Sequence, residues 1–207
     1  MELNDMIYGD IRVSNYEIDD FIIFRSDGSP VYNFTNVIDD HEMRISHVIR
    51  GEDHISNTHK QIHIYSALGW KIPQFAHLPM ILGQDKKRLS KRHGATSVES
   101  YRKEGYQPEA LINYLALLGW NPGTEEEIMS LPKLISKFDL SRVQKKSAIF
   151  DPKKLNWIGS QHLTIQNENK IFNSIKKIDP HWGDNKNKAY CIEVINLMIL
   201  RSSSLTD

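Results

Sequence analysis

Cysteine is almost missing from this sequence, and long apolar runs are missing altogether. The single cysteine, Cys191, excludes an internal disulfide and argues against a zinc site built from cysteines. Because it lies in an apolar stretch, we expect it to be a small core side chain. No apolar run approaches the roughly 20 residues that span a bilayer, and the polar start MELND is unlike a signal peptide. We therefore expect a soluble cytoplasmic protein with no membrane partner.

An excess of charge of one sign is also missing. The 207 residues include 26 Lys and Arg and 26 Asp and Glu, so the formal net charge is zero. Nothing global indicates a nucleic-acid partner, and any RNA contact must depend on local basic patches. A hydrophobic content of 40% and a charged content of 25% are those of an ordinary soluble protein, long enough for one substantial domain or two small ones.

The densest local pattern is the basic stretch 86–94, KKRLSKRHG. Gly83 precedes this stretch and Gly94 ends it, and both are expected to act as hinges because they lack a Cβ. Ammonium and guanidinium groups on a mobile loop suit a polyphosphate ligand. The alternative is a solvated basic run or an RNA-contacting patch. Five cations surround the hydroxyl of Ser90: Lys86, Lys87, Arg88, Lys91 and Arg92.

The first half of the chain contains a strand–helix–strand pattern. Ile45–Ile49 is an apolar strand, Thr58–Leu68 has helical periodicity, and Phe75–Leu82 is a second apolar segment. This spacing predicts a βαβ unit with parallel strands and a right-handed crossover. Ligands of such sheets gather outside the carboxyl ends of the strands. Arg50–His54 and the loop at 83–94 follow those ends, so we expect a site there.

For the regions on either side of this unit, the sequence predicts only the type and approximate range of each element. Short β segments are expected at Met6–Val13 and Phe21–Phe24, and Ser56 or Asn57 is expected to cap the crossover helix. The rest of the chain is predicted to be helical. One helix is expected to begin at Asp151–Pro152 and to be anchored by Leu155, Trp157 and Ile158. The other predicted helices are Pro108–Leu118, Ile171–Ile178 and Ala189–Leu200.

Two segments resemble one enzyme family. RLSKR, residues 88–92, resembles the KMSKS signature of class I aminoacyl-tRNA synthetases, and the sequence LSKRHG is similar to bacterial-type glutamyl-tRNA synthetases. Residues 32–61, YNFTNVIDDHEMRISHVIRGEDHISNTHKQ, resemble those enzymes over their whole length. Arg88 stands where the family often has lysine. This difference keeps the positive charge but replaces a compact ammonium with a planar guanidinium, which has a different contact geometry.

The resemblance implies an α/β fold, namely the second half of a Rossmann-type nucleotide-binding domain followed by an α-helical tRNA-contacting region. Residues 1–30 would be the tail of the acceptor-stem insertion, and 31–100 the second half of the catalytic domain with its KMSKS-type loop. Residues 101–150 would form a helical stem-contact region, and 151–207 the start of the helical anticodon-binding region.

The resemblance also implies a glutamate–tRNA ligase whose partners are ATP, with magnesium carried by ATP, L-glutamate and tRNA(Glu). The implied glutamate contacts are Tyr32, Asn36 and Arg50, and a guanidinium can match a carboxylate with two parallel hydrogen bonds. The implied catalytic residues are Arg88, Ser90 and Lys91. The implied ATP contacts are Asp53, His54, Leu82, Arg88, Leu89, Ser90, Lys91 and Arg92.

Two other groups contain residue types that bind metals. Asp39–Glu42 and the pair His59 and His63 provide carboxylates and imidazoles, but no full ligand set converges in the sequence. A solvated loop and a polar helix face explain them, so no resident metal is expected. The four tryptophans are expected to be core or rim anchors rather than platforms for base stacking.

The HIGH-type histidine motif of class I synthetases does not occur in this sequence. We therefore expect an internal piece of the enzyme that is inactive alone, with Ile45–Ile49 as an unpaired strand edge that could pair with the missing N-terminal half. One alternative is a non-catalytic RNA- or protein-binding fragment. Another is a paralogue that glutamylates a tRNA base, although the helical continuation after residue 150 argues against it.

Overall fold

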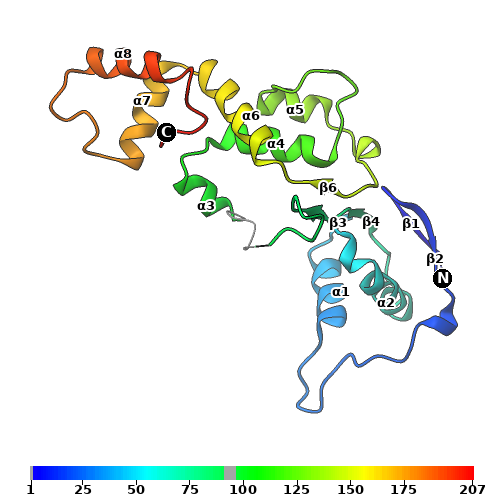
Figure 1. Ribbon diagram of the computed structural model, residues 1–207. Coiled ribbons are helices and arrows are strands. Elements are labelled where there is room, and N and C mark those ends of the chain that lie inside the picture. Colours follow the sequence, from blue (N-terminus) through cyan, green and yellow to red (C-terminus); the bar gives the residue numbers. More distant parts are fainter. Residues whose placement is uncertain (1, 91–96) are drawn as a thin grey trace. The chain divides into compact units, whose positions relative to one another are not determined.

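The computed structural model describes residues 2–90 and 97–207, which fall into two units (Figure 1). The first unit contains the chain up to Met80 together with Leu140–Ser147, and the second contains Ile81–Asp139 and Ala148–Asp207. Each unit has its own hydrophobic core and is described separately. The four domain ranges expected from the sequence remain a prediction.

The first unit is built on a four-stranded sheet with the strand order β2-β1-β4-β3. β1 and β2 pair antiparallel, whereas β4 pairs in parallel with both β1 and β3. The helix α2 connects β3 to β4, so the predicted βαβ unit is confirmed. The elements are β1 (Glu2–Asp5), β2 (Gly9–Arg12), η1 (Asn15–Glu17), α1 (Tyr32–Glu42), β3 (His47–Gly51), η2 (Glu52–His54), α2 (Ile55–Ala67), β4 (Gln74–Leu78) and η4 (Leu140–Arg142).

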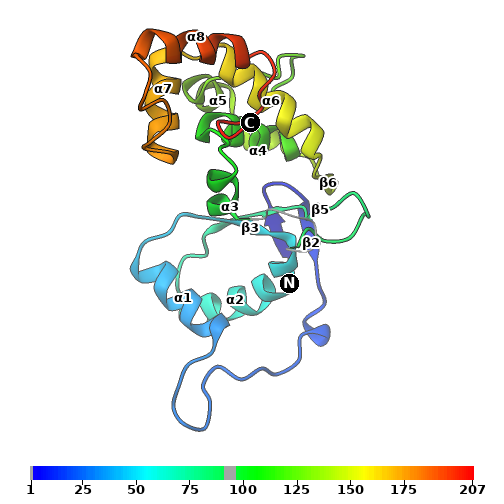
Figure 2. The same ribbon diagram turned by 60° about the vertical axis from the view of Figure 1, so that its left-hand side comes forward.

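Two small clusters form the core of the first unit. Leu3, Ile62 and Phe75 bring together β1, α2 and β4, while Ile64 and Tyr65 of α2 pack against α1 in a second cluster. Figure 2 shows α1 and α2 side by side, in agreement with their contacts. The sheet and the two helices therefore hold the carboxyl ends of β3 and β4 in fixed positions.

β3 lies at one end of the strand order and, among the described residues, pairs only with β4. Among the described residues, the expected unpaired edge therefore lies at His47–Gly51, and Ile45 and Ser46 of the predicted strand precede it. Ile49 of β3 is 53% exposed, which is high for an apolar strand residue.

Several local expectations were wrong. Met6–Tyr8 form a turn rather than a strand, because the Asp5 carboxylate accepts hydrogen bonds from the backbone N–H groups of Ile7 and Tyr8. Phe21–Phe24 form no strand and make only an isolated bridge, between Phe24 and Pro30. The helix α2 begins at Ile55 with His54 as its N-cap, so neither Ser56 nor Asn57 caps it.

The second unit contains a two-stranded parallel sheet and six helices among its described residues. Its core is a cluster that includes Leu111 and Tyr114 of α4 and Leu155 and Ile158 of α6. The elements are β5 (Ile81–Leu82), α3 (Val98–Lys103), α4 (Pro108–Gly119), α5 (Leu131–Lys137), β6 (Ala148–Ile149), α6 (Pro152–Thr164), α7 (Glu168–Ile178) and α8 (Lys188–Met198).

The predicted helices of this unit are confirmed in α4, α6, α7 and α8. Asp151 caps α6, since its carboxylate accepts a hydrogen bond from the backbone N–H of Lys153. Trp157, predicted as an anchor, is instead 44% exposed, because it does not share the helix face on which Leu155 and Ile158 lie three residues apart. Cys191 is buried, as predicted.

Gly159 of α6 provides a stability test. A Cβ at Gly159 would lie 2.3 Å from the carbonyl oxygen of Ser203, whereas a Cβ at Gly119, the last residue of α4, would meet no heavy atom within 4 Å. Gly159→Ala is expected to lower the free energy of unfolding by about 1–3 kcal/mol, despite the better helix propensity of alanine. Gly119→Ala is the matched control and should be neutral or stabilising. Urea unfolding measures both; equal effects would contradict the close packing at Ser203.

Candidate substrate-binding site

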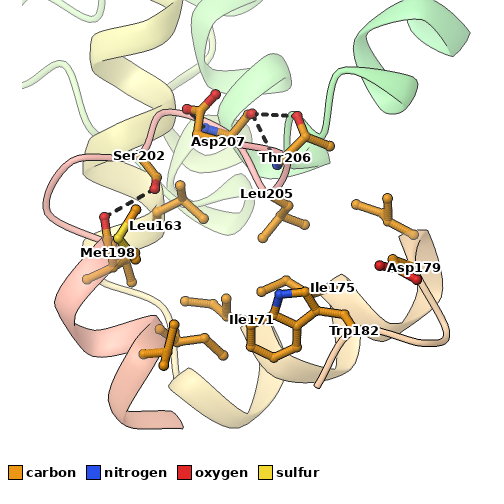
Figure 3. Close-up of a pocket in the computed structure, with 15 residues that line it drawn as sticks. Leu163, Ile171, Ile175, Asp179, Trp182, Met198, Ser202, Leu205, Thr206 and Asp207 are labelled. Carbon is orange, nitrogen blue, oxygen red and sulfur yellow. Dashed lines mark hydrogen bonds between the residues drawn. The ribbon is translucent and has the colours of Figure 1, made fainter. Parts of the chain in front are cut away.

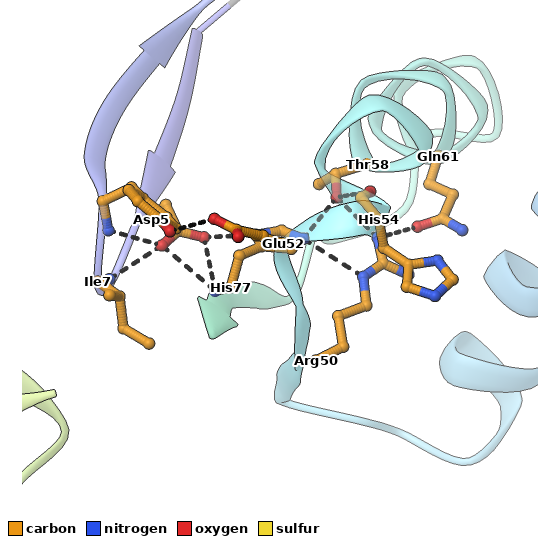
Figure 4. A network of polar contacts seen from close by, with 9 residues as sticks. Asp5, Ile7, Arg50, Glu52, His54, Thr58, Gln61 and His77 are labelled. Atoms are coloured by element: carbon orange, nitrogen blue, oxygen red, sulfur yellow. Dashed lines mark hydrogen bonds and ion pairs between the residues drawn. The ribbon is translucent and has the colours of Figure 1, made fainter. Parts of the chain in front are cut away.

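Arg50 lies near the carboxyl end of β3 and is fixed by side chains from α2 and β4 (Figure 4). Its Nη2 donates hydrogen bonds to Thr58 Oγ1 and Gln61 Oε1, each at 2.7 Å. Its Nε donates to His77 Nε2 at 3.3 Å. Arg50 and His77 are also direct partners in the parallel register of β3 and β4. The guanidinium is therefore anchored along the edge formed by Nε and Nη2.

The positive charge of Arg50 is half-buried and is not paired. Burial lowers the pKa of Arg50 from its ordinary value, although a guanidinium stays protonated in proteins. Within residues 2–90 and 97–207, no carboxylate forms an ion pair with it. The attraction of the nearby Asp40 and Asp53 opposes the lowering of the Arg50 pKa. A half-buried cation with no carboxylate in direct contact can bind an anion.

Tyr32 lies beside the remaining nitrogen of the guanidinium. Arg50 Nη1 is 3.5 Å from the Tyr32 hydroxyl, which in turn is 3.5 Å from His54 Nδ1. Asn36 follows Tyr32 on α1 by four residues, so the two side chains share one face of that helix. The structure thus brings together three of the predicted site residues, Tyr32, Arg50 and His54. Asn36 lies one turn further along α1, on the same helix face as Tyr32.

The residues of η2 point in different directions. Glu52 accepts hydrogen bonds from the backbone N–H of Met80, at 2.9 Å, and from the Tyr8 hydroxyl. Burial and the neighbouring Glu52 raise the pKa of Tyr8 to about 12. Asp53 is exposed, whereas His54 is half-buried and lies 3.2 Å from Asn57 Nδ2. Glu52 therefore has a structural role, and Asp53 and His54 remain accessible to a ligand.

The start of the basic loop is a hairpin in the second unit. Leu89 N–H donates to the Ile81 carbonyl at 2.9 Å, and Gly83 N–H donates to the Lys87 carbonyl at 2.8 Å. Gly83 is therefore held in a hydrogen-bonded turn and is not the free hinge expected from the sequence. Leu82 and Arg88 form an isolated antiparallel β-bridge. Leu89 packs against the core of the second unit. Ser90 is half-buried; Lys91, Arg92 and Gly94 lie outside the described residues.

Residues 1–157 match the family model described as tRNA synthetases class I (E and Q), catalytic domain. The chain belongs to this family. The resemblance on which the sequence interpretation depended is therefore confirmed, together with the α/β fold class.

Named relatives of this synthetase family agree with the match. The glutamate–tRNA ligase of Moorella thermoacetica is 60% identical over 169 residues, covering 82% of this chain and 34% of the relative. Glutamate–tRNA ligase 1 of Caldanaerobacter subterraneus is 45% identical over 208 residues, covering 99% of this chain and 43% of the relative. The chain thus spans well under half the length of these relatives.

A solved structure of the family is similar over the whole chain. The crystal structure of a glutamate tRNA ligase from Elizabethkingia meningosepticum, in complex with its amino acid, has a TM-score of 0.89 and 37% sequence identity. The match covers 100% of this chain and 45% of that one.

Four residues around Arg50 were missed by the sequence interpretation: Asp5, Thr58, Gln61 and His77. The sequence contained a signal for Thr58 and Gln61, because these polar residues lie three positions apart in the first turns of the helix that follows Arg50. His77 is a polar residue in an otherwise apolar strand segment, which is also a recognisable signal. Asp5 had none, since it reaches His77 only through the long-range pairing of β1 with β4.

The candidate metal ligands are not assembled into a site in the part of the chain that the structure describes. There, no group of three or more His, Cys, Asp or Glu side chains is placed to hold a metal ion. His59 is 4% exposed, and its burial lowers the pKa of its imidazole. None of the described helices is both long enough and apolar enough to cross a membrane.

A cavity of about 320 Å³ lies within the second unit (Figure 3). Its wall is formed by apolar side chains of α7 and α8, by the segment 199–207, and by Leu163 of α6 and Trp182. Asp207 lies at its rim, where its carboxylate accepts hydrogen bonds from the backbone N–H groups of Ser203 and Ser204. These bonds outweigh partial burial and lower the pKa of Asp207.

Proposed function

We propose that this chain is part of a glutamate–tRNA ligase, which activates L-glutamate with ATP and transfers it to tRNA(Glu) in the cytoplasm. The observation that carries the proposal is the half-buried guanidinium of Arg50, which has no carboxylate partner among the described residues and lies beside the Tyr32 hydroxyl. An acidic amino acid supplies the missing anion. The names of the relatives support the same substrate.

Tyr32, Asn36 and Arg50 would hold glutamate. A carboxylate oxygen of glutamate would attack the α-phosphorus of ATP, the bond to pyrophosphate would break, and pyrophosphate would leave with the bonding electron pair. A hydroxyl of the terminal ribose of tRNA would then attack the acyl carbon of the glutamyl-adenylate. The bond to the phosphate would break, and AMP would leave with the bonding electron pair. No general base is required in principle, because positioning of the reactants and stabilisation of phosphate charge can provide the rate.

On the ATP side, Asp53 and His54 would flank the adenosine, with Leu82 against it. ATP would arrive with its magnesium ion, and the cations of the signature fit its polyphosphate. Lys91 would stabilise the ATP phosphates, and the residues of the signature proposed to bind ATP are Arg88, Leu89, Ser90, Lys91 and Arg92. Residues 101–150 and 151–207 would contact the tRNA stem and begin the anticodon-binding region.

Lys91→Ala tests this proposal in a full-length glutamate–tRNA ligase that carries this segment. Because a loop cation should matter most when phosphate charge redistributes, adenylate formation is expected to slow by roughly 10²–10³-fold, with a much smaller change in ATP affinity. ATP–pyrophosphate exchange with glutamate and tRNA(Glu) present is the measurement. Lys87→Ala, a cation of the same stretch outside the signature, is the control and should stay near wild type. Unchanged turnover with only a raised ATP KM would defeat the assignment of Lys91.

A further inference from the structure

We propose that His77 is a positioning residue of the glutamate site: a neutral imidazole, protonated on Nδ1, that fixes which nitrogen of Arg50 faces the ligand. The proposal rests on the proposed function, since it concerns the guanidinium that would bind glutamate. It assigns a role to a buried pair, His77 and Asp5, that would not touch the substrate itself (Figure 4).

The proton on His77 follows from its neighbours. Arg50 Nε, 3.3 Å from His77 Nε2, can only donate a hydrogen bond, so Nε2 is placed to accept and to carry no proton. Thr58 Oγ1 lies 2.9 Å from the same nitrogen, and its hydroxyl can donate to an unprotonated Nε2 as well. The proton of the ring is then on Nδ1, which donates to Asp5 Oδ2 at 2.6 Å. Burial lowers the pKa of His77 and outweighs the opposing effect of Asp5, so the neutral ring is favoured. Both side chains are fully buried.

Asp5 fixes the ring in place from a third strand. Besides the bond from Nδ1, its carboxylate accepts hydrogen bonds from the backbone N–H of His77 at 3.1 Å and from those of Ile7 and Tyr8 at 2.9 Å. An acceptor with this many donors cannot rotate without losing several hydrogen bonds. The orientation of His77, and through it the position of Arg50 Nε, is therefore set by β1.

The consequence concerns which N–H groups remain for a ligand. A guanidinium has five N–H donors. Arg50 uses one on Nε for His77, two on Nη2 for Thr58 and Gln61, and one on Nη1 for a long contact of 3.5 Å with the Tyr32 hydroxyl. The second N–H of Nη1 has no hydrogen-bond partner among the described residues. The two-nitrogen match to a carboxylate expected from the sequence is therefore not available. The ligand carboxylate would instead meet Nη1 together with Tyr32.

Two substitutions of His77 separate its contact with Arg50 from its contact with Asp5. In His77→Gln the amide oxygen can take the place of Nε2 and still accept from Arg50. In His77→Asn the amide nitrogen can take the place of Nδ1 and donate to Asp5, but no acceptor reaches Arg50. In a full-length ligase that carries this segment, His77→Asn should raise the KM for glutamate about tenfold, and His77→Gln much less. The KM for ATP should change in neither.

A second measurement uses the 207-residue chain without any substrate. Nitrogen-15 NMR of its histidines, with the His77 signals assigned by their loss in His77→Gln, should show a proton on Nδ1 and a lone pair on Nε2. A proton on Nε2, or equal KM values for glutamate in the two variants, would overturn the role of His77. If the NMR result holds but the unsubstituted full-length protein does not use glutamate, the proposed function fails instead.

Discussion

Arg50→Lys, in a full-length ligase that carries this segment, is expected to lower kcat/KM for glutamate by roughly 10²–10³-fold although it conserves the charge. Arg50 makes three hydrogen bonds to Thr58, Gln61 and His77 and still has a nitrogen left beside Tyr32. A lysine ammonium is a single point with three N–H donors, so it cannot keep this network and also meet a ligand.

Glutamate titration at saturating ATP measures this effect. Arg44→Lys is the matched control, because Arg44 is exposed and lies just before β3; its variant should behave as wild type. Wild-type glutamate use by Arg50→Lys would remove Arg50 from the site. An equal loss in the Arg44 variant would show that the effect is not specific to the site.

The largest loss of stability is expected for Asp5→Ala. Asp5 is 1% exposed and accepts hydrogen bonds from three backbone N–H groups and from His77 Nδ1. Its removal leaves these buried donors unsatisfied, so the free energy of unfolding should fall by about 3–5 kcal/mol. Urea unfolding of the 207-residue chain is the measurement.

Asp10→Ala is the control for this substitution. Asp10 lies on the neighbouring strand β2, is exposed, and accepts one hydrogen bond from the Asn4 side chain. Its loss should change stability by no more than about 0.5 kcal/mol. Similar effects at Asp5 and Asp10 would show that the buried network around His77 contributes little to the fold.

Local sequence patterns predicted the part of the site that is local in the chain. The strand before Arg50 and the helix after it follow from the spacing of apolar residues, and the βαβ rule then placed Arg50–His54 at the carboxyl end of the sheet. The resemblance added Tyr32, which the structure brings within 3.5 Å of both Arg50 and His54.

The remaining parts of the site depend on long-range contacts, which the periodicity of apolar residues does not encode. Asp5 and His77 are 72 positions apart, and their hydrogen bond requires β1 to pair with β4. The orientation of Arg50 Nη1 toward the proposed ligand depends on that pairing of β1 with β4 as well. The hairpin before the basic loop was missed for a different reason: Lys86 has a φ of 60°, a conformation that sequence patterns usually associate with glycine or asparagine.

The proposed role of this segment is to bind glutamate for transfer to tRNA. Charging of tRNA(Glu) with labelled L-glutamate or L-glutamine, by a full-length protein that carries the segment, measures this role. We expect charging with glutamate that is abolished or strongly reduced by Arg50→Lys and not by Arg44→Lys. Charging with glutamine but not glutamate, or glutamate charging that does not depend on Arg50, would contradict it.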